Sequence, residues 1–136
     1  MKRSFIDTNV LVYANDARDS QKQEEAAALI AGHLREGSGV ISMQVLQEYA
    51  NTALAKLHQD EDVVLRLLHL LGRMTVVTPS PRLLRRQIEL RKVYDINFWD
   101  AGIVAAAEES DCDEILSEDF NTGQYYAGIL TVSPFL

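Results

Sequence analysis

Short apolar runs alternate with longer amphipathic segments along the chain. Apolar side chains three and four residues apart indicate one strongly helical segment, and they are Val45, Leu46, Tyr49, Ala50, Ala53, Leu54 and Leu57. Further helices are predicted at Val10–Ala14, Gln21–Glu36, Val63–Leu71, Pro81–Tyr94 and Phe98–Glu109. Short apolar runs near turn-forming residues predict five strands, at Ser4–Ile6, Gly39–Ile41, Met74–Val77, Glu114–Ser117 and Ile129–Val132.

Polar residues, glycine and proline mark where several of these helices begin and end. Ser20 is the predicted N-cap of the helix that begins at Gln21, and Gly37 is its predicted stop. Ser42 is the predicted N-cap of the helix that follows the second strand. Pro81 suits the first position of a helix, where a missing N–H costs nothing.

The alternating order of strands and helices predicts an α/β fold. Right-handed crossovers between such strands give a mostly parallel sheet with helices on both faces. We therefore expect a three-layer sandwich in which a central sheet of about five strands is flanked by helices. No repeat, low-complexity tract or linker divides the sequence, so residues 1–136 are interpreted as one domain.

Composition agrees with a folded protein that does not enter membranes. The chain has 136 residues, of which 47% are hydrophobic and 24% charged, and this balance excludes a largely disordered chain. The single cysteine, Cys112, excludes an internal disulfide framework. Apolar runs fall short of the ~20 residues of a membrane span. Asp7 and Asn9 interrupt the first apolar stretch before an export signal could form, so we expect a cytoplasmic protein.

Four acidic residues follow strands or occupy the first turns of helices. Asp7 ends the first strand and Asp119 follows the fourth, so in a parallel sheet both face the same crevice. Glu48 lies six residues beyond Ser42, about 9 Å along a helix at 1.5 Å per residue. Asp100 lies in the first turn of its helix. Each acid alone has an ordinary explanation as a cap, turn or surface residue, and the functional hypothesis depends on the set.

The net charge bears on what such a cluster of acids requires. Twenty acids against thirteen bases give a net charge of −7, which is unfavourable for holding a nucleic acid by charge alone. Carboxylates about 4 Å apart repel by ~4 kcal/mol at an effective dielectric constant near 20. A hard divalent cation removes this repulsion, and oxygen ligands suit Mg²⁺ or Mn²⁺. Such an ion would also supply positive charge for a phosphate.

One short segment is basic despite the acidity of the whole chain. Its bases are Arg82, Arg85, Arg86, Arg91 and Lys92. This cluster either contacts RNA phosphates or forms an ordinary solvated helix face. Trp99, next to Asp100, either packs the start of its helix or stacks on a base.

Four segments of the chain carry a family resemblance. They are Phe5–Tyr13, Ile41–Glu48, Phe98–Ala101 and Leu116–Phe120. Taken together and in this order, they resemble the four acidic motifs of the PIN-domain nucleases, and most closely those of the VapC-type toxin ribonucleases. Two residues depart from the common pattern: Met43 stands where threonine is frequent, and Gly102 where leucine is frequent.

The resemblance implies a metal-dependent endoribonuclease. Its acidic quartet, catalytic and metal-binding, would be Asp7, Glu48, Asp100 and Asp119, and Thr8, Asn9 and Ser117 match polar positions that support these acids. The resemblance further implies an RNA substrate, a cognate antitoxin whose tail blocks the groove, and a homodimer.

Two other functions remain open at this point. A phosphatase on a related scaffold would use Asp7 as a nucleophile, but Asn9 stands where such enzymes carry an acid as proton donor. A catalytically silent module would only bind RNA or protein, although a pure RNA binder gains nothing from concentrated negative charge.

Overall fold

In the computed structural model, the described residues, 2–135, form six helices and a sheet of six strands. The strands are β1 (Ser4–Ile6), β2 (Gly39–Ser42), β3 (Thr75–Val77), β4 (Glu114–Leu116), β5 (Tyr125–Tyr126) and β6 (Ile129–Val132). The helices are α1 (Thr8–Tyr13), α2 (Ser20–Glu36), α3 (Met43–Ala55), α4 (Glu61–Leu71), α5 (Pro81–Tyr94) and α6 (Phe98–Glu109). The expected domain, residues 1–136, extends one residue beyond the described part at each end.

The order of the strands in the sheet is β3-β2-β1-β4-β6-β5. Every neighbouring pair is parallel except β5 and β6, which are antiparallel. From β1 the chain builds the sheet outward first through β2 and β3, and later in the opposite direction through β4. The carboxyl ends of β1 and β4 are therefore adjacent where the strand order reverses, the place at which open parallel sheets bind ligands.

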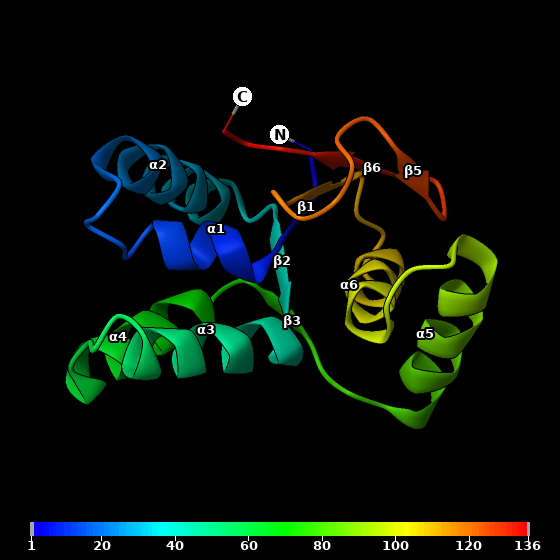
Figure 1. The fold of residues 1–136 in the computed structure, drawn as a ribbon, viewed down its shortest axis with the longest axis horizontal. Helices are drawn as coiled ribbons and strands as arrows, with labels where there is room; N and C mark the ends of the chain where they lie inside the picture. The colour runs from blue at the N-terminus through cyan, green and yellow to red at the C-terminus, as the bar shows by residue number, and fades with distance from the viewer. Residues whose placement is uncertain (1, 136) are drawn as a thin grey trace.

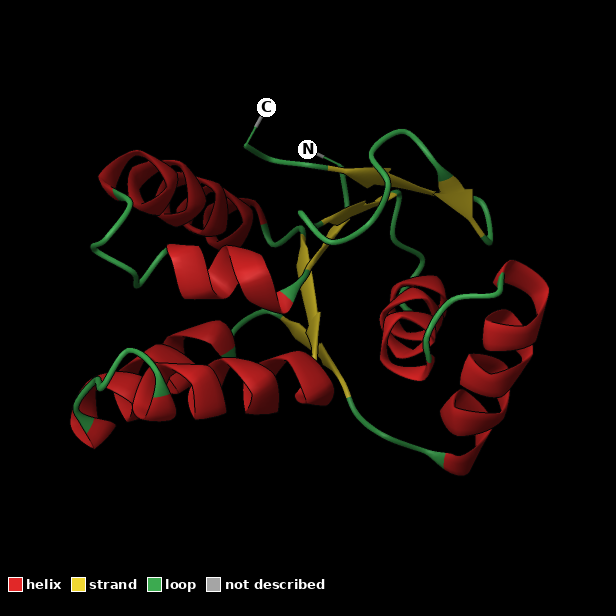
Figure 2. Cartoon of the chain, viewed as in Figure 1, coloured by secondary structure: helices red, strands yellow, loops and turns green. Residues whose placement is uncertain are grey.

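Helices cover both faces of the sheet, which confirms the predicted three-layer α/β architecture. Figure 1 shows α1, α2, α3 and α4 on one side of the strands and α5 and α6 on the other. In Figure 2 the sheet is seen between these two groups of helices. None of the helices formed by residues 2–135 is long and apolar enough to cross a bilayer.

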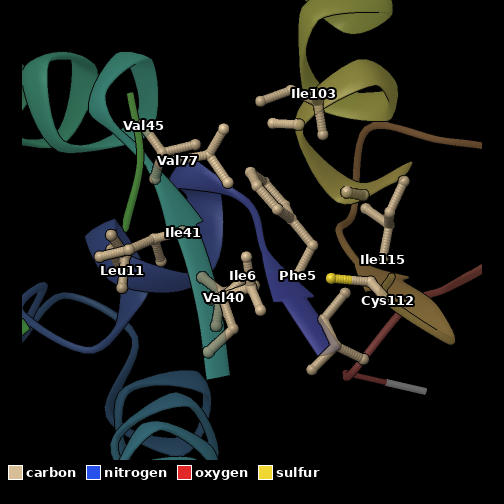
Figure 3. Close-up of a cluster of buried hydrophobic side chains, with 14 of the residues drawn as sticks. Phe5, Ile6, Leu11, Val40, Ile41, Val45, Val77, Ile103, Cys112 and Ile115 are labelled. Carbon is tan, nitrogen blue, oxygen red and sulfur yellow. The ribbon is translucent and has the colours of Figure 1, made fainter. Parts of the chain in front are cut away.

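Because both faces are covered, consecutive residues of the central strands are buried. Phe5 and Ile6 on β1 and Val40 and Ile41 on β2 have no exposed surface. Figure 3 shows how these side chains leave the strands toward the two helical layers, with Leu11 packed on one side and Ile103 on the other. This core fixes the position of the residue that follows β1.

The sheet has one strand more than the five predicted. The additional strand, β5, has two residues and pairs with β6 across a two-residue turn in which Ala127 has φ +51° and Gly128 φ +80°. Positive φ at both positions matches the twist of a tight hairpin, but Ala is an unusual residue for it. The Ala127 N–H donates to the Tyr94 hydroxyl oxygen at 2.6 Å, a contact from α5 that supports the turn.

Several helix boundaries differ from the prediction, and at the starts of α1 and α2 the capping side chain is the reason. Asp19, not Ser20, is the N-cap of α2, and its carboxylate accepts from the Lys22 N–H at 3.1 Å. Helix α1 begins at Thr8 because the preceding residue, Asp7, caps it. Helix α3 ends at Ala55, short of Leu57.

Candidate active site

Asp7 is the most enclosed of the four acids, with 6% of its surface exposed. Its backbone continues β1, since its N–H donates to the Leu116 carbonyl oxygen of β4 at 3.0 Å. One carboxylate oxygen, Oδ1, caps α1 by accepting from the Thr8 N–H at 2.7 Å. The other, Oδ2, accepts from the Ser117 hydroxyl at 2.7 Å. A short apolar strand followed by a helix N-cap thus places a buried carboxylate where the strand order reverses.

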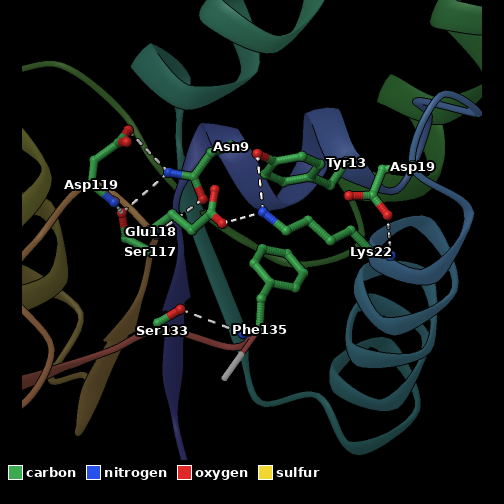
Figure 4. A network of polar contacts seen from close by, with 9 residues as sticks. All are labelled: Asn9, Tyr13, Asp19, Lys22, Ser117, Glu118, Asp119, Ser133 and Phe135. Carbon is green, nitrogen blue, oxygen red and sulfur yellow. Dashed lines mark hydrogen bonds and ion pairs between the residues drawn. The ribbon is translucent and has the colours of Figure 1, made fainter.

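Asn9 and Ser117 connect Asp7 to Asp119. The Asn9 amide nitrogen lies 3.4 Å from Asp7 Oδ2, 3.2 Å from Ser117 Oγ and 3.1 Å from Asp119 Oδ2. The Asp119 N–H donates to Ser117 Oγ at 3.0 Å, and the Glu118 N–H donates to Asn9 Oδ1 at 3.2 Å. Figure 4 shows Asn9 facing the turn that carries Ser117 and Asp119. The three supporting positions suggested by the sequence therefore contact at least one of the acids.

Glu48 joins this group from α3. Its carboxylate accepts from the Thr8 hydroxyl at 2.8 Å and from the Gln44 amide at 3.0 Å. The same Gln44 amide lies 3.4 Å from the carbonyl oxygen of Trp99, on α6. A Cβ atom at Gly102 would lie 2.7 Å from Gln87 Nε2 and 2.8 Å from Gln44 Oε1, so both glutamine side chains approach the backbone of α6 closely there. Gly102, one of the departures from the family pattern, thus leaves space for Gln87 and Gln44.

Asp100 lies in the first turn of α6, as expected. Its side chain accepts from the Asn97 amide at 2.8 Å, and its N–H donates to Asn97 Oδ1 at 2.8 Å. This reciprocal pair caps the helix and fixes the direction of the carboxylate.

Burial and mutual repulsion change the acidity of two of these groups. Burial, and to a smaller extent the charges of Asp119 and Glu48, raise the pKa of Asp7 from 3.8 to about 6, against hydrogen bonds from Ser117 and Thr8. Burial raises the pKa of Asp100, and the charges of Asp119 and Glu48 add to this effect. The charges of Asp119 and Glu48 therefore act on both Asp7 and Asp100.

The acids have neutral partners. None of the ion pairs between residues 2–135 involves Asp7, Glu48, Asp100 or Asp119. In this part of the chain, no group of three or more His, Cys, Asp or Glu side chains is placed to hold a metal ion. The donor set nevertheless suits a hard divalent cation, because carboxylate oxygens are its preferred ligands. A common ion would require some of these side chains to turn toward it.

The sequence interpretation missed Gln44 and Asn97, which hold Glu48 and Asp100. Both had a local signal. Gln44 precedes Glu48 by four residues, so the two share one face of α3. Asn97 directly precedes an apolar helix, the usual position of an N-cap.

The basic segment is only partly available to a ligand. Arg86 forms a two-pronged ion pair with Glu108 at 2.6 and 2.8 Å, and Arg82 pairs with Glu109 at 2.5 Å. Arg85, Arg91 and Lys92 are exposed on α5.

Trp99 is more exposed than its expected packing role suggests. It is 61% exposed, and its ring meets that of Phe98 edge to face with centroids 5.0 Å apart. It lines a cavity of about 580 Å³ between α3, α5 and α6.

Ser117 is expected to control the acidity of Asp7. In Ser117→Ala, the pKa of Asp7 should rise above about 6, because the strongest hydrogen bond to its ionised form is lost. The measurement is a carboxyl-carbon NMR titration. Ser80→Ala is the matched control, because it removes the N-cap of α5 without touching Asp7. An unchanged Asp7 titration in Ser117→Ala would contradict the proposed role of this hydroxyl.

Comparisons with known proteins identify the family of this chain. The PIN domain family matches residues 4–127, so the chain belongs to the PIN domain family. No significant match is found among curated proteins.

Solved structures show the same fold at low sequence identity. A chain of a toxin–antitoxin complex from Klebsiella pneumoniae has a TM-score of 0.70 and 22% identity, over 97% of this chain and 98% of that chain. The sarcin-ricin loop cleaving toxin VapC20 of Mycobacterium tuberculosis has a TM-score of 0.69 and 18% identity, over 85% and 89%. A chain of VapBC2 from Rickettsia felis, solved with a DNA fragment of its promoter, has a TM-score of 0.70 and 16% identity, over 96% and 97%.

Proposed function

We propose that this protein is a metal-dependent endoribonuclease and the toxin of a toxin–antitoxin pair, acting in the cytoplasm. The observation that supports this most strongly is Asp7, a buried carboxylate at the switch point of the sheet. Its hydrogen-bond donors are all neutral, and the charges of Asp119 and Glu48 raise its pKa further. Repulsion between carboxylates destabilises the fold, and a bound cation would relieve it. The arrangement therefore supports a site that binds a cation.

The acidic quartet, Asp7, Glu48, Asp100 and Asp119, would hold the cation, with Mg²⁺ as the expected ion and Mn²⁺ as a substitute. When bound, it would supply positive charge for a phosphodiester oxygen and lower the pKa of a water ligand. The surrounding side chains orient the acids. Ser117 and Thr8 each fix one oxygen of Asp7, and Asn9 holds Asp119.

The RNA would lie across this end of the sheet. Arg85, Arg91 and Lys92 are the bases of the α5 cluster most available for phosphates, since Arg82 and Arg86 already have carboxylate partners. The exposed Trp99 ring is suited to stacking on an unpaired base.

A protein partner is part of the proposal. The similar structures from Klebsiella pneumoniae and Rickettsia felis are toxin–antitoxin assemblies, which supports a cognate antitoxin for this chain. We also propose a homodimer. Residues from the α3–α4 region that remain exposed offer an apolar surface for such contacts, and they are Leu54, Val63, Leu65 and Leu70.

Removal of divalent metal is expected to abolish RNA cleavage. The purified protein should cut single-stranded or looped RNA with Mg²⁺ or Mn²⁺, lose this activity in excess EDTA and regain it when metal is restored. Mn²⁺ should also raise the melting temperature, because binding to the folded state stabilises it. Persistent cleavage in EDTA would refute the metal requirement. RNA binding in EDTA with no cleavage after metal addition would instead support a silent binding module.

A further inference from the structure

Outside the acidic quartet, a positively charged ammonium group lies close to the turn that carries Asp119. It belongs to Lys22, in the first turn of α2, which forms an ion pair with the carboxylate of Glu118. Both side chains are partly exposed, each with 29% of its side-chain surface accessible. Glu118 lies between Ser117 and Asp119, and the mechanism proposed above gives it no role.

Lys22 is held in place from several directions. The backbone N–H of Lys22 donates to the carboxylate of Asp19, the N-cap of α2, at 3.1 Å. Its ammonium nitrogen lies 4.4 Å from the centre of the Tyr13 ring and 5.3 Å from that of Phe135. These rings meet edge to face with centroids 5.1 Å apart. Figure 4 shows the Lys22 side chain extending past both rings toward Glu118. Two electron-rich faces and one carboxylate thus stabilise the ammonium group.

The other side of the same turn is held by Asn9. The Glu118 N–H donates to Asn9 Oδ1, and the Asn9 amide nitrogen contacts Asp119 Oδ2. Asn9 therefore holds the backbone of Glu118 by a hydrogen bond, while Lys22 holds its side chain by an ion pair. A turn held at both points has few alternative conformations, so the carboxylate of Asp119 keeps its direction toward the other three acids.

We propose that Lys22 is a positioning residue, which fixes the Ser117–Asp119 turn through Glu118 and so orients Asp119. This inference rests on the proposed function, since it assigns Lys22 a part in the metal-dependent site. Lys22 itself lies outside the four acidic motifs, and its ion pair with Glu118 connects the start of α2 to the site.

The effect of Lys22→Met on Mn²⁺ affinity depends on whether Lys22 acts through its charge or by positioning the turn, and the two roles predict opposite changes. If Lys22 acted only through its charge, its loss would make the site more negative and would tighten Mn²⁺ binding. If Lys22 positions the turn, its loss should weaken Mn²⁺ binding about tenfold, as is typical when groups that support metal ligands are removed. Mn²⁺ affinity, measured by electron paramagnetic resonance or calorimetry, therefore distinguishes the two without any activity assay.

The experiment compares four variants with the wild type. Lys22→Met and Glu118→Gln each remove one partner, and the double variant removes both without changing the net charge. Because the two residues act as one unit, the double variant should lose no more affinity than Lys22→Met alone. Arg18→Met is the matched control, since it removes a nearby cation that pairs with Asp16 and has no contact with Glu118.

A second measurement does not depend on metal. Hydrogen exchange of the Glu118 and Asp119 amides, which donate to Asn9 and Ser117, should be about tenfold faster in Lys22→Met, because the turn opens more often. Exchange in Arg18→Met should match the wild type. Tighter Mn²⁺ binding or unchanged amide exchange in Lys22→Met would overturn the inference.

The outcomes separate this inference from the proposed function. A wild type that binds Mn²⁺ but cuts no RNA would refute the ribonuclease, while Lys22 is still judged by Mn²⁺ affinity and exchange. A wild type that binds no Mn²⁺ would refute the metal site, and amide exchange alone then decides. A wild type that cuts RNA, together with a Lys22→Met variant equal to it in both readouts, would refute only the inference.

Discussion

Replacing Asp7 by asparagine is expected to abolish RNA cleavage while the protein stays folded. Asn keeps the size of the side chain and an oxygen that can cap α1, so the contact with the Thr8 N–H survives. The variant loses the negative charge that the proposed cation requires. We expect single-turnover cleavage in saturating Mg²⁺ to slow on the order of 10³-fold or more, as when a group that organises charge at a reacting centre is removed.

The matched control for this loss is Asp16→Asn. Asp16 is as buried as Asp7, at 7% against 6% exposed, but its carboxylate pairs with Arg18 outside the acidic quartet. This variant should cut RNA at close to the wild-type rate. Circular dichroism and thermal melting check that both variants are folded. If Asp7→Asn cut RNA as fast as the wild type, the proposed active site would be wrong.

The same substitution should change how stability depends on pH. Burial raises the pKa of Asp7 from 3.8 to about 6 in the folded protein, so the folded state holds the proton of this carboxyl more tightly. The protonated Asp7 carboxyl therefore contributes its full stabilisation below pH 3.8, and this contribution is lost as the pH rises through about 6. Relative to Asp7→Asn, the wild-type free energy of unfolding should fall by roughly 3 kcal/mol, at about 1.4 kcal/mol per pKa unit.

Urea unfolding from pH 3.5 to 8 in the presence of EDTA measures this difference. The control again is Asp16→Asn, for which the opposite sign is expected. Hydrogen bonds from Arg18 lower the pKa of Asp16 from its ordinary 3.8, so the wild type should gain stability over this variant only at the acid end of this range and keep a constant advantage at higher pH. A pH-independent difference between the wild type and Asp7→Asn would show that burial of Asp7 is not costly. A buried charge that lowers the free energy of unfolding is common at functional positions, where activity is gained at the expense of stability.

Local patterns predicted most of the layered fold because each element carries its own signals. Helices α5 and α6 have the predicted bounds, and strands β1 and β6 likewise. Strand β5 escaped prediction because Tyr125 and Tyr126 form a strand only by pairing with β6. The N-cap of α2 moved to Asp19 because two adjacent residues were both good caps, and local sequence does not decide between them.

The sequence by itself determined the order of the elements and which acids follow them, because apolar periodicity and capping residues act over a few neighbours. Tertiary structure alone decided how those acids are held. The Ser117 hydroxyl bonds to Asp7 from 110 residues away, and Asn9 spans the same separation to reach Asp119. Likewise, only folding brings Lys22 to Glu118 and makes Arg82 and Arg86 partners of glutamates. These contacts depend on the strand order and on packing between layers, which no local pattern records.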